Sequence, residues 1–321
     1  MTPEQFSERM ASIRREVEKA IVGQEEVVSQ LLLCLVAQGH ALIEGVPGLG
    51  KTLMVRSLAQ ALSLRFSRIQ FTPDLMPADI TGTLVLEEEA GKRQFRFQEG
   101  PVFANLVLAD EVNRATPKTQ LALLEAMQES TVTVARTTHL LPRPFYVFAT
   151  QNPIEMEGTY PLPEAQLDRF FLKILIEYPT DRQMVEILSR TTGLEEPAVE
   201  AAAEASDLLA MHHLAREVPV AQAVYQYAVE LAESTRPQDG KAGEMVRRFV
   251  RFGASPRGAQ ALIMAGKVRA LSEGRFHVSR DDLRQVAPPT LRHRLLLNYE
   301  AQVEGISADQ ILGQVITRLG D

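Results

Sequence analysis

Short apolar runs alternate with helical segments through the first half of the chain. The five runs that we interpret as strands span residues 41–43, 65–71, 105–110, 145–150 and 169–176. Most of these runs are continuously apolar, which is typical of strands buried on both faces of a parallel sheet. Two helices are predicted before the first run, at residues 4–20 and 21–38, and further helices between the runs. This alternation predicts an α/β fold with a mostly parallel five-stranded sheet and helices on both faces.

Two further stretches have the pattern of β-hairpins. Residues 83–97 contain two arms of alternating polar and apolar residues, separated by the polar turn Glu88-Glu89-Ala90-Gly91-Lys92. Alternation with a period of two on either side of a short turn is typical of a hairpin. A second candidate covers residues 131–141. We therefore expect two hairpin inserts in the sheet domain.

The second half of the chain is almost entirely helical in its pattern. Tyr178-Pro179 closes the last predicted strand region, and the clearest helix beyond it begins at the capping pair Ser255-Pro256. Pro288-Pro289 predicts a break in a later helix, because proline lacks the N–H group that a helix needs. We expect an α/β domain over residues 1–178 and a helical domain over residues 179–321.

The segment after the first strand has the pattern of a phosphate-binding loop. Residues 45–52 have the form G-x-x-x-x-G-K-T, placed between a strand and a helix as such a loop requires. Its glycines let successive backbone N–H groups point at phosphate oxygens, and the helix adds its positive N-terminal end. Lys51 is expected to reach the β- and γ-phosphates, and the Thr52 hydroxyl to bind Mg²⁺. The residues expected to contact the nucleotide are Gly45, Pro47, Gly48, Leu49, Gly50, Lys51, Thr52 and Leu53. The apolar positions of the helix are expected to be Leu53, Val55, Leu58, Leu62 and Leu64.

Two adjacent carboxylates follow a second apolar strand. Residues 105–109 lead directly into Asp110 and Glu111. Asp110 suits a Mg²⁺ ion held through water, because this ion gives up its water reluctantly. Glu111 suits a group that polarises a water for attack on the γ-phosphate. An apolar run that ends in Asp-Glu is by itself common at solvated strand ends, and its combination with the loop favours the catalytic interpretation.

Composition narrows the class of protein. The chain has 321 residues, of which 45% are hydrophobic, and a formal net charge of −7. This charge argues against a general DNA-coating protein, although it does not exclude a local basic pore. The one cysteine, Cys34, lies in an apolar run and is expected to be a buried thiol, so a disulfide within the chain is excluded. No apolar stretch approaches 18 residues and the polar N-terminus lacks a signal-peptide pattern, so no membrane span and a cytoplasmic location are expected.

Several motifs together resemble a known family. After the phosphate loop come Ala-Asp-Glu-x-Asn-Arg-Ala at 109–115, Gln-Asn-Pro at 151–153, Gly-Thr-Tyr-x-Leu-Pro-Glu-Ala-Gln-Leu-Asp-Arg-Phe at 158–170 and Gly-Ala-Ser-Pro-Arg at 253–257. This order resembles the MoxR family of AAA+ ATPases over nearly the whole chain. The resemblance implies a P-loop ATPase core, a C-terminal helical lid domain, and ATP and Mg²⁺ as cofactors.

The resemblance also implies roles for individual residues. The segment that includes Val22 and Gly23 would line the adenine pocket, and Asn152 would be the sensor 1 residue that orients the attacking water. Arg169 would be the arginine finger, supplied to the neighbouring subunit, and Arg257 the sensor 2 arginine of the lid. A planar guanidinium does suit the charge that develops on γ-phosphoryl oxygens. Taken singly, the two arginines could instead be surface ion-pair residues, and Asn152 could serve the turn before Pro153.

Three further positions are weaker candidates. Arg114 is a candidate to face a neighbour's nucleotide, with a solvated arginine as the alternative. Gln70 is a candidate to sense nucleotide through Glu111, with a core or edge amide as the favoured alternative. His212 and His213 are adjacent on a helix and face different sides, so no metal site is expected there.

The resemblance implies a Mg²⁺-dependent ATPase that works as a homo-oligomeric ring, expected to be a hexamer. Such proteins act as chaperone-like factors that mature or remodel protein complexes, often with a partner that carries a von Willebrand factor A domain. The alternatives are the ATPase subunit of a metal chelatase and a nucleic-acid motor or loader. Nucleic acid is disfavoured by the acidity of the chain, although Lys92, Arg93 and Arg96 on the first hairpin keep it open.

Overall fold

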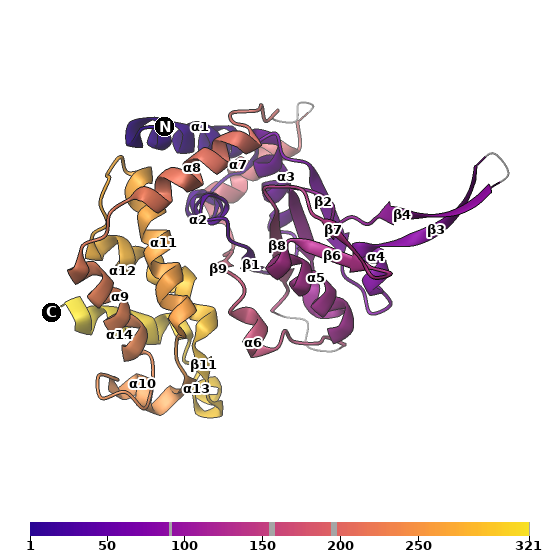
Figure 1. Cartoon of the computed structure of the whole chain (residues 1–321). Coiled ribbons are helices and arrows are strands. Elements are labelled where there is room, and N and C mark those ends of the chain that lie inside the picture. Colours follow the sequence, from indigo (N-terminus) through magenta and orange to yellow (C-terminus); the bar gives the residue numbers. More distant parts are fainter. Residues whose placement is uncertain (90–91, 154–157, 194–197, 321) are drawn as a thin grey trace.

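The computed structural model describes residues 1–89, 92–153, 158–193 and 198–320. A five-stranded sheet with the strand order β2-β5-β8-β1-β9 forms its centre, and every neighbouring pair in it is parallel (Figure 1). The strands are β1 (Ala41–Glu44), β2 (Phe66–Gln70), β5 (Leu106–Asp110), β8 (Tyr146–Gln151) and β9 (Leu172–Leu175). The five-stranded sheet predicted from the sequence is confirmed. Because all five strands run in one direction, their carboxyl ends share one edge of the sheet.

Helices cover both faces of this sheet. The helices of the sheet region are α1 (Pro3–Ala20), α2 (Glu25–Val36), α3 (Lys51–Ala61), α4 (Pro77–Thr81), α5 (Pro117–Glu129) and α6 (Glu164–Leu167), with a short 3₁₀ turn at Val112–Arg114. Successive strand residues point to opposite faces, so Ile43 packs into the core that contains α1, α2 and α3, whereas Leu42 packs into the core that contains α5. Cys34 is fully buried in the first core, as predicted, and burial raises the pKa of its thiol.

The helix after the phosphate loop differs in part from its predicted pattern. Met54, Val55 and Leu58 form its buried face, whereas Leu53 is 44% exposed. The helix ends at Ala61, so the buried residues Leu62 and Leu64 belong to the following turn and not to the helix. The prediction was wrong for Leu53 because the next residue, Met54, faces the core, and neighbouring helix residues point about 100° apart.

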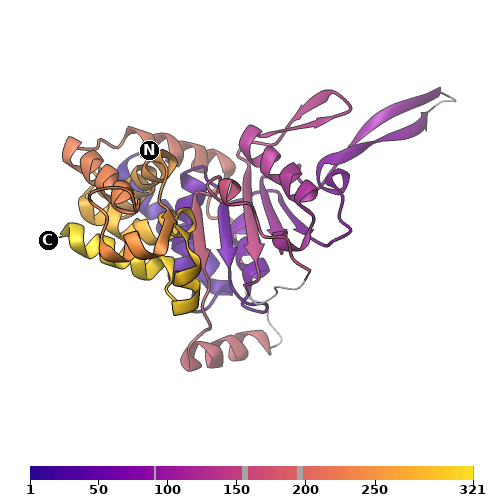
Figure 2. The same cartoon turned by 90° about the horizontal axis from the view of Figure 1, so that it is seen from below.

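Two antiparallel hairpins lie where the sequence predicts inserts. The first pairs β3 (Gly82–Glu89) with β4 (Lys92–Glu99) and projects far from the body of the molecule (Figures 1 and 2). Ala90 and Gly91 of its expected turn lie outside the described residues. The second pairs β6 (Thr131–Val134) with β7 (Thr137–Leu140). The two hairpins are joined by the ring of Phe97, which stacks on the ring of His139 with centroids 3.9 Å apart.

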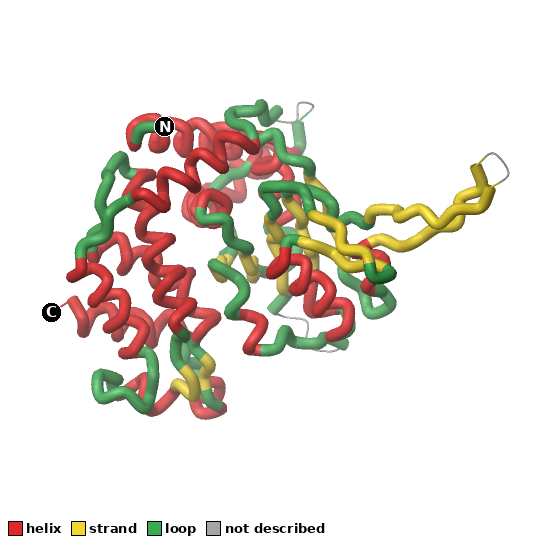
Figure 3. Tube along the Cα trace, in the orientation of Figure 1, coloured by secondary structure: helices red, strands yellow, loops and turns green. Residues whose placement is uncertain are grey.

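The remaining chain is mostly helical and gathers on one side of the sheet (Figure 3). Its elements are α7 (Asp181–Thr191), α8 (Ala205–Glu217), α9 (Gln222–Ser234), α10 (Glu244–Phe249), β10 (Val250–Phe252), α11 (Pro256–Ser272), α12 (Arg280–Leu291), a 3₁₀ turn at Arg292–Arg294, β11 (Leu296–Leu297), α13 (Tyr299–Glu304) and α14 (Ala308–Gly320). A domain boundary near residue 179 stays a prediction.

The predicted break at Pro288-Pro289 is wrong, because α12 continues through both prolines. They lie in the last turn, since the helix ends at Leu291, and each removes one N–H group that would donate to a carbonyl of the preceding turn. Val286, Ala287 and Leu291 are buried around them. Packing of this apolar face offsets what the prolines remove.

The 3₁₀ turn at Arg292–Arg294 fastens the helical region to the strand region. Arg292 Nη1 donates a hydrogen bond to Lys173 O at 3.2 Å, and Arg294 Nη2 donates one to Phe170 O at 2.8 Å. His293 Nε2 lies 2.9 Å from the same Phe170 oxygen. Burial, with Arg294 nearby, holds the pKa of His293 well below its usual range, so the ring is neutral.

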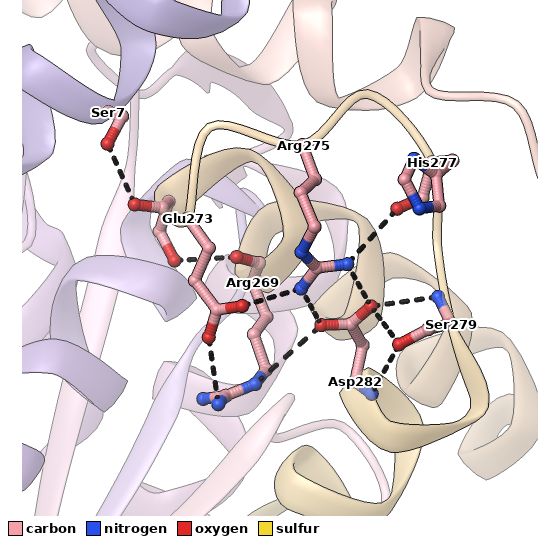
Figure 4. Close-up of polar contacts among 8 residues, drawn as sticks. Ser7, Arg269, Glu273, Arg275, His277, Ser279 and Asp282 are labelled. Carbon is pink, nitrogen blue, oxygen red and sulfur yellow. Dashed lines mark hydrogen bonds and ion pairs between the residues drawn. The ribbon is translucent and has the colours of Figure 1, made fainter.

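A charged network closes the turn between α11 and α12 (Figure 4). Asp282 is only 1% exposed and accepts from Arg275 through both oxygens, at 2.5 and 2.8 Å. It also caps α12 together with Ser279, whose hydroxyl donates to it at 2.7 Å. Burial alone raises the pKa of Asp282, but the hydrogen bonds from Arg275 and Ser279 outweigh it and lower the pKa. Nearby, Ser7 Oγ donates to Ser272 O and ties α1 to α11.

We expect Asp282→Asn to destabilise the protein by about 3 kcal/mol, because it leaves the Arg275 guanidinium without its buried counter-charge. Because the pKa of Asp282 is lowered, its contribution is present above the ordinary pH range of a carboxyl group and is lost as pH falls through the lowered value. Urea unfolding at pH 7 measures the change. The control is Asp281→Asn, which removes an exposed carboxylate from the same helical turn. Equal stability of the two variants would contradict the role given to Asp282.

Candidate nucleotide-binding site

The phosphate loop lies at the carboxyl edge of the sheet, between β1 and α3. Gly48 and Gly50 have φ angles of 85° and 75°, a left-handed conformation that glycine adopts without strain. Gly50 is also the N-cap of α3, which begins at Lys51, so the N–H groups of the first helical turn face the loop. This arrangement makes a concave anion site of backbone N–H groups.

Lys51 lies over this loop. Its ammonium donates to Gly45 O at 2.6 Å and to Val46 O at 3.0 Å. Partial burial lowers the pKa of Lys51, and the nearby charges of Asp110 and Glu111 partly offset this effect. Lys51 therefore lies within the electrostatic reach of both carboxylates, although it is about 60 positions away from them in the sequence.

Asp110 and Glu111 stand at the end of β5, on the same edge. Asp110 is 7% exposed, and its Oδ1 accepts from the Thr150 hydroxyl at 2.6 Å. Glu111 has a φ of 56°, a conformation that costs energy in a residue other than glycine and is frequent at functional sites. Its N–H donates to the same Thr150 hydroxyl at 2.8 Å. One threonine on β8 thus fixes both acidic residues.

The side chain of Glu111 is held from two sides. Its Oε2 accepts from Gln70 Nε2 at 2.8 Å and from Arg114 Nη1 at 3.1 Å. Gln70 lies on β2 beside Asp110, with which it is in register. The structure thus shows the contact with Glu111 that we considered the less favoured alternative for Gln70. Arg114 contacts Glu111 of its own chain.

Thr52 and Asp110 have the chemistry of a magnesium site. A hydroxyl and a carboxylate are hard oxygen donors, and Mg²⁺ usually takes one or two carboxylates, waters and substrate phosphates. Among the described residues no group of three or more His, Cys, Asp or Glu side chains could hold a metal ion. His212 Nδ1 lies 3.0 Å from Val36 O.

Asn152 follows the last residue of β8, the strand between β1 and β5. It is 6% exposed. Gln151 is in register with Glu44 at the end of β1, so Asn152 is placed between the phosphate loop and the Asp110–Glu111 pair. This is the position in which an amide could orient a water near the γ-phosphate.

The Val22–Gly23 turn reaches the same region. Gln183 at the start of α7 donates to Gly23 O at 3.4 Å, and Gln24 donates to Glu177 O at 3.3 Å. The chain between these contacts leaves β9 at Ile176, whose N–H donates to Glu44 O at 2.8 Å. Val22 and Gly23 therefore border the carboxyl edge, where the resemblance placed the adenine pocket.

Arg169 and Arg257 lie at the opposite edge. Arg169 precedes β9, and the Phe171 N–H donates to His40 O just before β1 begins. Since β9 has 4 residues, the two edges are about 13 Å apart. Arg169 Nη1 donates to Leu124 O of α5 at 2.8 Å. In Figure 1, α6 and the start of α11 lie on the lower side of the molecule and α3 on the upper side.

Asp168 links the segments that carry Arg169 and Arg257. Its Oδ2 accepts from Ser255, the N-cap of α11, at 3.0 Å, and its Oδ1 accepts from Arg294 Nε at 2.8 Å. Arg257 is exposed in the first turn of that helix. The structure thus places Arg257 beside Arg169 and away from the phosphate loop of its own chain.

Two residues of the site were not foreseen from the sequence. Thr150 is the polar end of an apolar strand, a signal that could have been noticed. Arg68 donates to Asp110 Oδ2 from β2. It lies two positions before Gln70 and so on the same face of the strand, but only the pairing of β2 with β5 reveals its partner.

Comparison with known proteins defines the class of protein to which this chain belongs. The family described as ATPase family associated with various cellular activities (AAA) matches residues 40–172, and the AAA lid domain family matches residues 243–315. A solved structure of a "putative ATPase" from Cytophaga hutchinsonii is similar with a TM-score of 0.90 and 41% identity, covering 98% of this chain and 95% of that one. The fold and the loop together are those of an AAA+ ATPase with a helical lid.

Curated relatives narrow the class to one family. Chaperone MoxR1 of Mycobacterium tuberculosis is 44% identical over 94% of this chain and 79% of its own length. Protein MoxR of Methylorubrum extorquens is 33% identical over 94% of this chain and 92% of its own length. The chain belongs to the MoxR family of AAA+ ATPases. Within the described residues no helix is long and apolar enough to cross a lipid bilayer.

Proposed function

We propose that this protein hydrolyses Mg²⁺-bound ATP at the carboxyl edge of its sheet. The observation that carries the proposal is the convergence of three separate segments at one edge of the sheet: the phosphate loop with Lys51, the end of β5 with Asp110 and Glu111, and the end of β8 with Asn152. Loop N–H groups and Lys51 would hold the phosphates, while Thr52 and Asp110 would hold Mg²⁺, which neutralises charge on the β- and γ-phosphate oxygens.

In this mechanism Glu111 activates a water that Asn152 orients. The water oxygen forms a bond to the γ-phosphorus as the bond to the bridging oxygen breaks, which releases ADP and phosphate. Glu111 takes the water proton and returns it to phosphate or solvent. The left-handed backbone of Glu111, fixed by Thr150, turns this carboxylate away from the strand direction that Asp110 follows.

The location of Arg169 and Arg257 supports a ring. A residue on the amino edge serves a nucleotide on the carboxyl edge when the subunits contact each other head to tail, and such contacts close into rings. Arg169 would exchange its hydrogen bond with Leu124 O for the neighbour's phosphate oxygens. An arginine supplied in trans is typically worth about 10³–10⁵ in rate. By family resemblance we expect a hexamer.

We further propose a chaperone-like role on protein complexes in the cytoplasm, with a von Willebrand factor A domain protein as a candidate partner. The name of the relative Chaperone MoxR1 supports the role, and the partner rests on family resemblance alone. A nucleic-acid motor is less well supported, because Arg93 and Arg96 each lie 3.3 Å from a glutamate of the same hairpin, Glu88 and Glu87. Co-purification with tagged protein and sequencing of neighbouring genes test the partner.

Replacing Lys51 by alanine should weaken ATP binding by about 10- to 100-fold, because a hydrogen bond to a charged group contributes about 1.5–3 kcal/mol. Calorimetric titration with ATP and Mg²⁺ measures the effect. The matched control is Arg56→Ala, which removes an exposed cation from the same helix. If both variants bind ATP as the parent does, the phosphate-loop assignment is wrong.

A further inference from the structure

Arg68 pairs with Asp110, the carboxylate that the proposed mechanism assigns to the metal ion. Arg68 Nη2 and Nε both donate to Asp110 Oδ2, at 2.6 and 3.1 Å. The other oxygen of Asp110 accepts from the buried Thr150 hydroxyl. Both oxygens of Asp110 therefore have a partner, and its charge is balanced by the Arg68 guanidinium.

The same guanidinium reaches the second carboxylate through Gln70. Arg68 Nη2 donates to Gln70 Oε1 at 2.7 Å, and Gln70 Nε2 donates to Glu111 Oε2 at 2.8 Å. Because an amide has one oxygen and one NH₂ group, fixing its oxygen on Arg68 fixes its NH₂ group towards Glu111. Arg68 is thus connected to Asp110 directly and to Glu111 through one amide.

The Arg68 side chain is exposed enough to move away from Asp110. The Arg68 side chain is 45% exposed, whereas that of Asp110 is 11% exposed. Arg68 lies on β2, the edge strand of the sheet, and a half-exposed arginine can turn its charged end into water. Asp110, in contrast, is held in place by Thr150.

We propose that Arg68 is a positioning residue that competes with a divalent cation for Asp110 and relays the outcome to Glu111 through Gln70. While Arg68 holds Asp110, Gln70 is oriented to hold Glu111. When Arg68 yields Asp110 to a cation, Gln70 loses the partner of its oxygen and is free to leave Glu111, whose carboxylate then keeps its contact with Arg114 and can turn towards its water. The inference rests on the proposed ATPase function for the role of Glu111, but the competition at Asp110 does not.

The competition is tested without nucleotide, with Mn²⁺ as the probe. Removing a unit positive charge from beside a partly buried carboxylate should tighten binding of a divalent cation by about tenfold. We expect Arg68→Met to bind Mn²⁺ about tenfold more tightly than the parent, measured by electron paramagnetic resonance of the free ion. The control is Arg65→Met, which removes an exposed arginine just before the same strand and should change nothing.

Further variants test whether the gain in Mn²⁺ affinity arises at Asp110. Adding Asp110→Asn to Arg68→Met should abolish the gain, which places it at Asp110. Arg68→Gln is a second neutral variant, and the gain should appear in it as well if Arg68→Met does not fold. Unchanged Mn²⁺ affinity in folded Arg68→Met or Arg68→Gln overturns the competition. A purely structural ion pair would lower thermal stability without raising Mn²⁺ affinity.

The relay is tested by a double-mutant cycle on ATP turnover at saturating Mg²⁺. If Arg68 acts on Glu111 through Gln70, then Arg68→Met, Gln70→Ala and the double variant should change kcat by the same factor within about twofold, because the second change removes nothing further. If the factors by which the two single variants change kcat multiply in the double variant, the relay is wrong. A parent chain without ATPase activity would instead refute the proposed function, and the Mn²⁺ experiment would still decide the competition.

Discussion

Replacing Glu111 by glutamine should lower ATP turnover by about 10²–10⁴-fold, the range typical of a general base, and leave ATP binding close to that of the parent. The amide keeps the shape of the side chain and can still accept from Gln70 and Arg114 through its oxygen, so the local geometry is preserved. What it loses is the capacity to take a proton from water. The variant should therefore accumulate in an ATP-bound form.

Single-turnover hydrolysis with radiolabelled ATP, together with calorimetric ATP binding, separates the two effects. Glu8→Gln is a suitable control, because it neutralises an exposed glutamate on α1. A Glu111→Gln chain that binds ATP and hydrolyses it at the parent rate would show that another group activates the water.

Mixing two inactive variants should restore ATP hydrolysis across a subunit boundary. Arg169→Ala keeps its own phosphate loop but cannot supply the arginine, whereas Lys51→Ala can supply it but binds ATP poorly. Arg169→Ala alone should lose about 10³-fold or more in rate, and Lys51→Ala alone should be limited by its weak ATP binding. In a randomly mixed head-to-tail ring, about a quarter of the interfaces join an intact loop to an intact arginine. The mixture should then regain a comparable fraction of the parent activity.

The recovery should depend on assembly. It should rise with total protein and disappear on dilution to monomers, as followed by light scattering. Because Arg257 lies on the same edge as Arg169, Arg257→Ala mixed with Lys51→Ala should also recover activity. An arginine that serves its own nucleotide would give no recovery, and constant turnover per subunit down to the monomer would exclude the ring mechanism.

The sequence predicts those parts of the site that are local in the chain. The phosphate loop is eight consecutive residues whose order alone defines its backbone, and Asp110 and Glu111 follow directly from the end of an apolar strand. The central strands β1, β5 and β8 were predicted because burial on both faces makes each a mostly apolar run, whereas the edge strands β2 and β9 mix polar residues with apolar ones. The roles of these residues stay predictions, but their placement on one edge follows from parallel strands.

What could not be predicted depends on which segments become neighbours. Arg68 and Asp110 are 42 positions apart, and nothing in either segment indicates that β2 pairs with β5. The place of Arg257 depends on the contact of Ser255 with Asp168, which fixes the lid. Pro288-Pro289 was misinterpreted because the rule for proline describes an isolated helix, whereas the packing of Val286, Ala287 and Leu291 decides the matter in the folded chain.

The contacts of Asp168 and of the Arg292–Arg294 turn limit how the lid can move. A lid that is joined to its core by a single connection can rotate about that connection as a hinge. Here Arg292, His293 and Arg294 fasten the helical region to residues 168–173, and the contact of Ser7 with Ser272 holds α1 to α11. Attachments at separate places oppose such a rotation and leave only small displacements of the lid. Since Arg169 and Arg257 both adjoin Asp168, a small displacement would carry the two arginines in the same direction.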